Sequence, residues 1–104
     1  MGKYLLAYRG GRMAETQEAR DAQMAAWGAW FGRLGDAVVD PGNPFAGSVS
    51  VNNDGTVGEG AGSGLGGYSV LQADSLATAT ELAKGSPVLN NGGSVDVYET
   101  MAVM

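Results

Sequence analysis

Apolar side chains between residues 24 and 38 repeat with the spacing of an α-helix. They follow one another at intervals of three, four, three and four residues, so on a helix they form a single stripe. The members of this stripe are Met24, Trp27, Phe31, Leu34 and Val38. We therefore predict a helix over residues 16–38, with Trp30 on the flank of the stripe, packed against another layer of the protein.

The segments around this helix alternate or run apolar in the manner of strands. Strands are predicted at 3–9, 45–51, 65–73 and 94–103, and a second helix at 76–83 after the N-cap pair Asp74 and Ser75. The order strand, helix, strand, strand, helix, strand defines the ferredoxin-like βαββαβ arrangement. The fold class expected is α+β, with a four-stranded antiparallel sheet and both helices on one face.

The 104 residues are of the size of one domain, and we expect a single domain over 1–104. Both helices cover the same face of the expected sheet, yet the strands carry apolar side chains on both faces. Soluble monomers rarely expose an apolar patch of that size. We therefore expect a homodimer that packs sheet against sheet, in the manner of a dimeric α/β barrel.

The charge balance limits the partners. The net charge is -5, whereas nucleic acids and anionic membranes bind surfaces with an excess of Lys and Arg. We expect neither partner. The first nine residues have no signal-peptide pattern and no segment is long and apolar enough to span a membrane, so a cytoplasmic location is expected.

The chain has no Cys and no His. This composition removes disulfides, thiol nucleophiles, zinc sites with His or Cys ligands, and catalytic triads built on imidazole. We expect no cofactor and no metal. Any acid–base chemistry falls to carboxylates.

Several segments together resemble the YCII-related family, also described as YciI-like or DGPF-type. The resemblance spans nearly the whole chain and rests on Lys3–Leu6, Trp30–Asp40 before a Pro-Gly-Asn-Pro turn, Gly66–Tyr68, Ala73–Leu76 and Gly92–Glu99. It implies a ferredoxin-like fold that forms a dimeric α+β barrel. Two features depart from the family. The His that many members carry in the first helix is absent, with Met24 and Trp27 in that region, and Asp54-Gly55-Thr56-Val57 replaces the Asp-Gly-Pro-Phe signature.

Aromatic side chains on the predicted strands suggest a binding site for a small organic molecule. Tyr offers a rigid wall with one polar group, and Arg can hold an anion. The expected lining of an inter-sheet cavity is Tyr8, Arg9, Phe45, Tyr68 and Tyr98. Asp40 at its edge is the candidate base for isomerase- or lyase-like chemistry. The alternatives are that these tyrosines are core and interface residues, and that the protein is a non-catalytic regulatory or assembly dimer.

Two further patterns are weaker indications of function. The run at residues 62–67 satisfies G-x-G-x-x-G, but it leads into a predicted strand, whereas a dinucleotide site needs a helix there. A flexible hairpin loop is the favoured interpretation. Asp36 and Asp40, four residues apart at the end of the predicted helix, either share a proton on one helix face or are both solvated.

Overall fold

The computed structural model describes residues 1–12, 14–62 and 64–103. It contains six strands, two α-helices and two 3-10 helices. In chain order these are β1 (Gly2–Arg9), α1 (Gln17–Leu34), η1 (Gly35–Ala37), β2 (Val38–Asp40), β3 (Val49–Val51), β4 (Val57–Glu59), β5 (Leu65–Ala73), α2 (Leu76–Ala83), η2 (Pro87–Asn91) and β6 (Ser94–Glu99).

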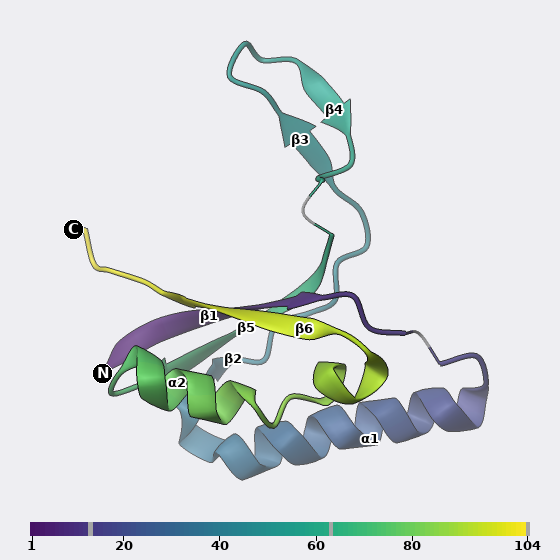
Figure 1. Cartoon of the computed structure of the whole chain (residues 1–104), viewed down its shortest axis with the longest axis vertical. Coiled ribbons are helices and arrows are strands. Elements are labelled where there is room, and N and C mark those ends of the chain that lie inside the picture. Colours follow the sequence, from purple (N-terminus) through teal and green to yellow (C-terminus); the bar gives the residue numbers. More distant parts are fainter. Residues whose placement is uncertain (13, 63, 104) are drawn as a thin grey trace.

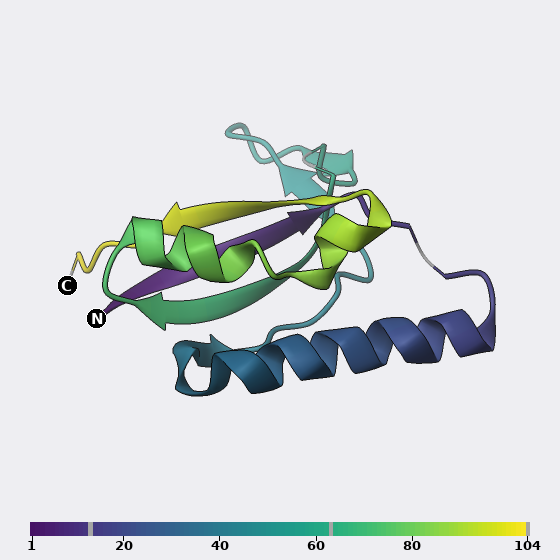
Figure 2. The same cartoon turned by 60° about the horizontal axis from the view of Figure 1, so that its bottom comes forward.

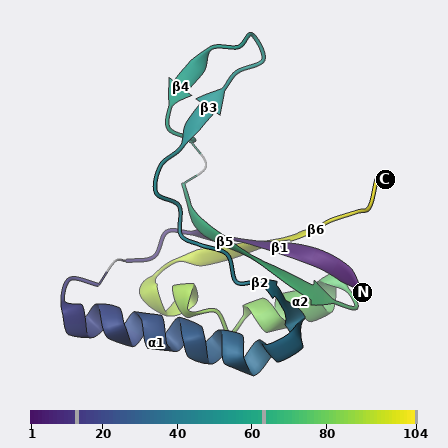
Figure 3. The same ribbon diagram turned by 180° about the vertical axis from the view of Figure 1, so that it is seen from behind.

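Four strands form the main sheet in the order β2-β5-β1-β6, with each neighbouring pair antiparallel. Both α-helices and η2 lie on one side of this sheet (Figure 1 and, from behind, Figure 3). The ferredoxin-like α+β fold and the single helix-covered face are thus confirmed. We call the opposite side the open face; strand alternation places Leu5, Ala7, Tyr68, Val70 and Tyr98 on it.

The core lies between the sheet and the helices. Its main cluster consists of Leu6, Tyr8, Trp30, Leu71, Ala83 and Val88. Trp30 is only 2% exposed and supplies the buried anchor of α1. Trp27, Phe31 and Leu34 pack against this cluster as half-buried side chains, whereas Met24 is 74% exposed. The predicted stripe therefore packs through its middle residues and not through its first.

The first helix ends earlier than predicted. α1 stops at Leu34 because Gly35 follows with φ +55°, a conformation that favours glycine, and its N–H closes on the carbonyl of Phe31. Val38 then leaves the helix and begins β2, the edge strand beside β5. The prediction that the helix continues to residue 38 is therefore wrong, because residues 35–37 form η1 and Val38 belongs to β2.

The prediction of a second sheet strand at 45–51 is also wrong. The partner of β5 is β2, and Val49–Val51 instead forms β3 of a separate two-stranded hairpin with β4. Short alternating strands joined by the Asn52–Gly55 turn pair most readily with each other. This hairpin projects from the open side of the main sheet (Figure 1).

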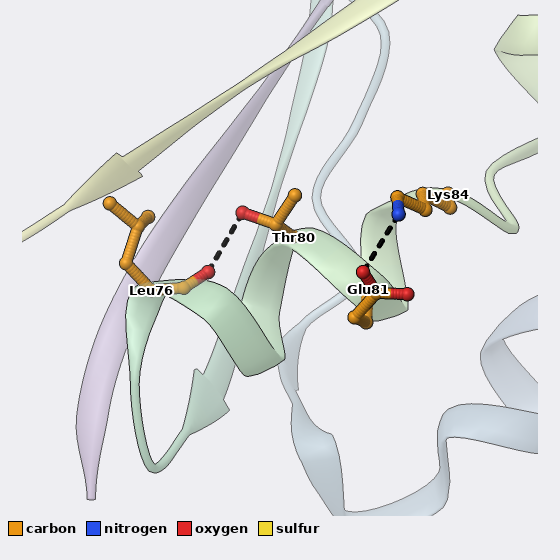
Figure 4. Close-up of polar contacts among 4 residues, drawn as sticks. All are labelled: Leu76, Thr80, Glu81 and Lys84. Atoms are coloured by element: carbon orange, nitrogen blue, oxygen red, sulfur yellow. Dashed lines mark hydrogen bonds and ion pairs between the residues drawn. The ribbon is translucent and has the colours of Figure 1, made fainter.

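The second helix begins and ends as its sequence predicts. Ser75 Oγ accepts a hydrogen bond from the N–H of Thr78 at 3.1 Å. On the exposed side, the Thr80 hydroxyl donates to the Leu76 carbonyl at 2.8 Å, and Lys84 Nζ lies 2.7 Å from Glu81 Oε1 (Figure 4). Figure 2 shows α2 lying over the sheet roughly along the direction of the strands, with α1 running in about the same direction beside it.

The last strand is shorter than the predicted 94–103. β6 pairs only with β1, and Thr100 still donates its N–H to the Lys3 carbonyl at 3.1 Å. Residues 101–103 have no β-strand partner, because β1 begins at Gly2. Met101 and Val103 are more than 80% exposed as a consequence.

Replacing Gly32 with Ala should stabilise the protein. A Cβ at this position of α1 would meet nothing within 4 Å, and alanine is favoured over glycine in a helix by about 0.5–1 kcal/mol. Urea unfolding should show this increase in the free energy of unfolding. Gly35→Ala is the matched control and should lower it, because that residue has φ +55°.

Candidate functional site

A cavity of about 490 Å³ opens at the β2 side of the sheet, between α1 and the segment that follows β2. Its lining is mainly aromatic, proline and glycine. The residues are Tyr8, Gly10, Met24, Trp27, Phe31, Pro41, Gly42, Asn43, Pro44, Gly66, Gly67, Tyr68 and Ser69. This size and apolar character are typical of sites for small molecules.

Segment 41–45 forms the outer wall because it is held along β5. The Asn43 carbonyl accepts the N–H of Tyr68 at 3.3 Å, and the N–H of Phe45 donates to the Gly66 carbonyl at 2.8 Å. Gly42 adopts φ +72°, and a Cβ there would lie 1.8 Å from the Tyr68 carbonyl oxygen. Glycine is therefore required for the wall to approach the strand this closely.

Tyr8 and Trp27 meet in the inner wall. Strand alternation turns Tyr8 toward the helices, where its ring packs edge-to-face on Trp27 with the ring centroids 4.9 Å apart. Tyr8 is only 7% exposed. This contact joins β1 to α1 at the cavity wall.

Three polar groups of the wall form one short chain of hydrogen bonds. The Tyr8 hydroxyl donates to Ser69 Oγ at 2.8 Å, and Ser69 Oγ donates to the Pro41 carbonyl at 2.6 Å. Burial raises the pKa of Tyr8 to about 12. Tyr8 is thus a neutral hydrogen-bonding group at physiological pH and not a base.

The raised pKa of Tyr8 makes stability depend on pH in the alkaline range. An unfolded tyrosine loses its proton near pH 10, whereas Tyr8 keeps its proton in the fold until about 12. Over this range the unfolded chain binds fewer protons, so the free energy of unfolding falls as pH rises. Urea unfolding at pH 9, 10 and 11 should show a smaller fall in Tyr8→Phe than in the wild type. Equal slopes would contradict this assignment.

The expected site residues do not all lie together. Tyr8 is on the helix side, whereas Tyr98 and Arg9 are on the open face, and Arg9 forms an ion pair with Asp96. The Tyr68 ring stacks on Phe45 with centroids 5.9 Å apart. Only Tyr8 and Tyr68 of the predicted set line the cavity described above.

Asp40 lies beside the cavity and is held by two hydrogen bonds. Its Oδ1 accepts the N–H of Gly42 at 2.9 Å, and its Oδ2 accepts the Tyr68 hydroxyl at 3.3 Å. Asp36 belongs to η1, so the expectation that Asp36 and Asp40 share a helix face is wrong. Asp40 thereby fixes the turn that leads into the outer wall.

Most of the residues that line the cavity are not predicted as site residues from the sequence. The helical spacing of Trp27 and Phe31 predicts packing alone, whereas in the structure both pack against the core and also line the cavity. The signal available was Pro41-Gly42-Asn43-Pro44, whose prolines and glycine serve as the wall and not only as a turn. The glycine run at 62–67, of which Ser63 lies outside the described residues, leads into β5, as expected, and not into a helix.

Within 1–12, 14–62 and 64–103, no three His, Cys, Asp or Glu side chains gather in a way that could hold a metal ion. Over the same ranges, no helix has both the length and the apolar character to cross a membrane.

The fold and this site define an α+β protein of ferredoxin-like topology with an aromatic cavity beside its first helix. No protein-family model matches the sequence, and no curated protein matches it. Among solved structures it is similar to the 5-chloro-2-hydroxyhydroquinone dehydrochlorinase of Burkholderia phenoliruptrix, determined in complex with 2,5-dihydroxybenzoquinone. The TM-score is 0.56 at 19% identity, over 94% of this chain and 93% of that chain. This likeness shows the fold.

Proposed function

We propose that this protein binds a small, single-ring aromatic compound in the cavity between α1 and segment 41–45. The observation that carries the proposal is the lining: four aromatic residues, Tyr8, Trp27, Phe31 and Tyr68, and two prolines surround a cavity of about 490 Å³. Such a lining holds a flat ring through area burial and aromatic contacts. The similar dehydrochlorinase was solved with a six-membered quinone ring bound, which supports a ligand of this size.

Binding is favoured over catalysis by the chemistry of the lining. The described residues that line the cavity include no Asp, Glu, Lys or Arg. Asp40, the expected base, directs both carboxylate oxygens to Gly42 and Tyr68. A binding function therefore accounts for the site with the residues present, and carboxylate acid–base chemistry is the second candidate.

The test is an NMR titration of ¹⁵N-labelled protein with phenol, anisole and toluene. We expect saturable shifts of the Trp27 indole N–H and of the Gly42 and Gly67 amides, because all three residues line the cavity. Trp30 is buried and does not line the cavity, so it serves as the internal control. Absence of saturable shifts with all three compounds would overturn the proposal.

We further propose that a second copy of the chain covers the open face. Its centre carries Leu5 and Val70 from the two middle strands, and Tyr98 beside them is 53% exposed. Sheets pack face to face about 10 Å apart by interlocking such side chains. A two-fold axis through this patch would place the same apolar residues against each other, and the hairpin, which rises on this side, would lie alongside the partner.

Replacing Leu5 with Arg should separate the dimer. The new charge would be buried between two sheets, next to its own copy across the axis. Native mass spectrometry should give twice the 10.6 kDa chain mass for the wild type and the single mass for Leu5→Arg. Leu89→Arg is the control, since Leu89 is 41% exposed on the helix side, and it should remain dimeric. A monomeric wild type would contradict the proposal.

A further inference from the structure

The wall of the cavity has a fixed hydrogen-bond polarity. The Pro41 carbonyl can only accept, and it lies 2.6 Å from Ser69 Oγ, so the single hydroxyl proton of Ser69 must point to it. Ser69 Oγ can then only accept a hydrogen bond from Tyr8. The 2.8 Å contact between the two hydroxyls must therefore use the proton of Tyr8.

This order leaves the Tyr8 oxygen as an acceptor. Its one proton is committed to Ser69, and its remaining capacity is lone pairs. Tyr8, Ser69 and Pro41 all line the cavity, so the phenolic end of Tyr8 lies at the cavity wall. Because Ser69 is fully buried and Tyr8 is 7% exposed, water does not readily replace either bond.

We propose that Tyr8 selects a ligand that donates a hydrogen bond from a neutral group, such as a phenol hydroxyl, and disfavours ligands that only accept. A carboxylate would meet the lone pairs of Tyr8 with no cation among the described lining residues to compensate for its lost hydration. An ether or a carbonyl oxygen would also face the lone pairs of Tyr8, and neither group has a proton to donate to them. This inference rests on the proposed binding of a single-ring aromatic compound and adds the polarity of that compound.

The experiment compares phenol with anisole, which has the same ring and oxygen but no proton to donate. We expect phenol to bind the wild-type protein roughly fivefold to tenfold more tightly, as one net hydrogen bond provides. Tyr8→Phe should bring the two affinities together by weakening phenol. Equal affinities in the wild type would overturn the inference and leave the proposed function standing, whereas no binding of either compound would overturn both.

A second variant tests the direction of the hydrogen-bond chain. Ser69→Ala removes the acceptor of the Tyr8 proton, which then becomes free to turn into the cavity. Acetophenone, a ligand that only accepts, should bind Ser69→Ala severalfold more tightly than it binds the wild type. A merely structural role of Ser69 would weaken all ligands alike. That uniform weakening, or an unchanged preference, would contradict the inference.

Discussion

Trp30→Ala is expected to lower the free energy of unfolding by about 3–5 kcal/mol, the range for removing a large aromatic side chain from a packed core. Trp30 is 2% exposed and is the buried residue of α1. It joins the helix to Leu6 and Leu71 of the two middle strands and to Ala83 of α2, in one cluster. Its loss would remove the main apolar anchor of α1 and leave a cavity at the centre of the fold.

Urea unfolding followed by circular dichroism measures this effect. Met24→Ala is the matched control, because Met24 lies on the same helix but is 74% exposed. Its replacement should change the free energy of unfolding by no more than about 0.5 kcal/mol. If the two variants were equally stable, the assignment of Trp30 as the anchor of α1 would be wrong.

Gly42→Ala should weaken phenol binding strongly and destabilise the fold. The new Cβ would lie 1.8 Å from the Tyr68 carbonyl oxygen, a separation that no rotamer change can relieve because the clash is with backbone. The φ of +72° adds strain of about 1–2 kcal/mol for an alanine. Segment 41–45 would have to move away from β5, which opens the outer wall of the cavity.

We expect phenol affinity in Gly42→Ala to fall at least tenfold and the free energy of unfolding to fall by about 2 kcal/mol or more. Gly47→Ala is the control, because its Cβ would meet nothing within 4 Å and its φ is not positive. It should match the wild type in both measurements. Wild-type affinity in Gly42→Ala would show that the cavity wall described here does not form the binding site.

The order of the main elements could be predicted because each rests on a local signal. The second helix was located closely by the Ser75 N-cap and its apolar side. The end of the first helix could not be predicted, since Gly28, Gly32 and Gly35 look alike in the sequence. Of these three, only Gly35 takes a positive φ, and it lies where the chain leaves α1 for η1 and β2.

The candidate site was predicted only in part for a related reason. Alternation along β1 correctly separates Tyr8 from Leu5 and Ala7. It does not say which side the helices cover, because both sides are apolar. Tyr8 and Tyr98 were therefore expected to line one cavity, and the tertiary fold places them on opposite faces of the sheet.

The most direct test of this account is a crystal structure of the protein with phenol bound. We predict the ring in the cavity between Trp27 and segment 41–45, with its hydroxyl oxygen within about 3.2 Å of the Tyr8 oxygen. A phenol bound at the open face beside Tyr98, or one in the cavity with its hydroxyl turned away from Tyr8, would contradict the account.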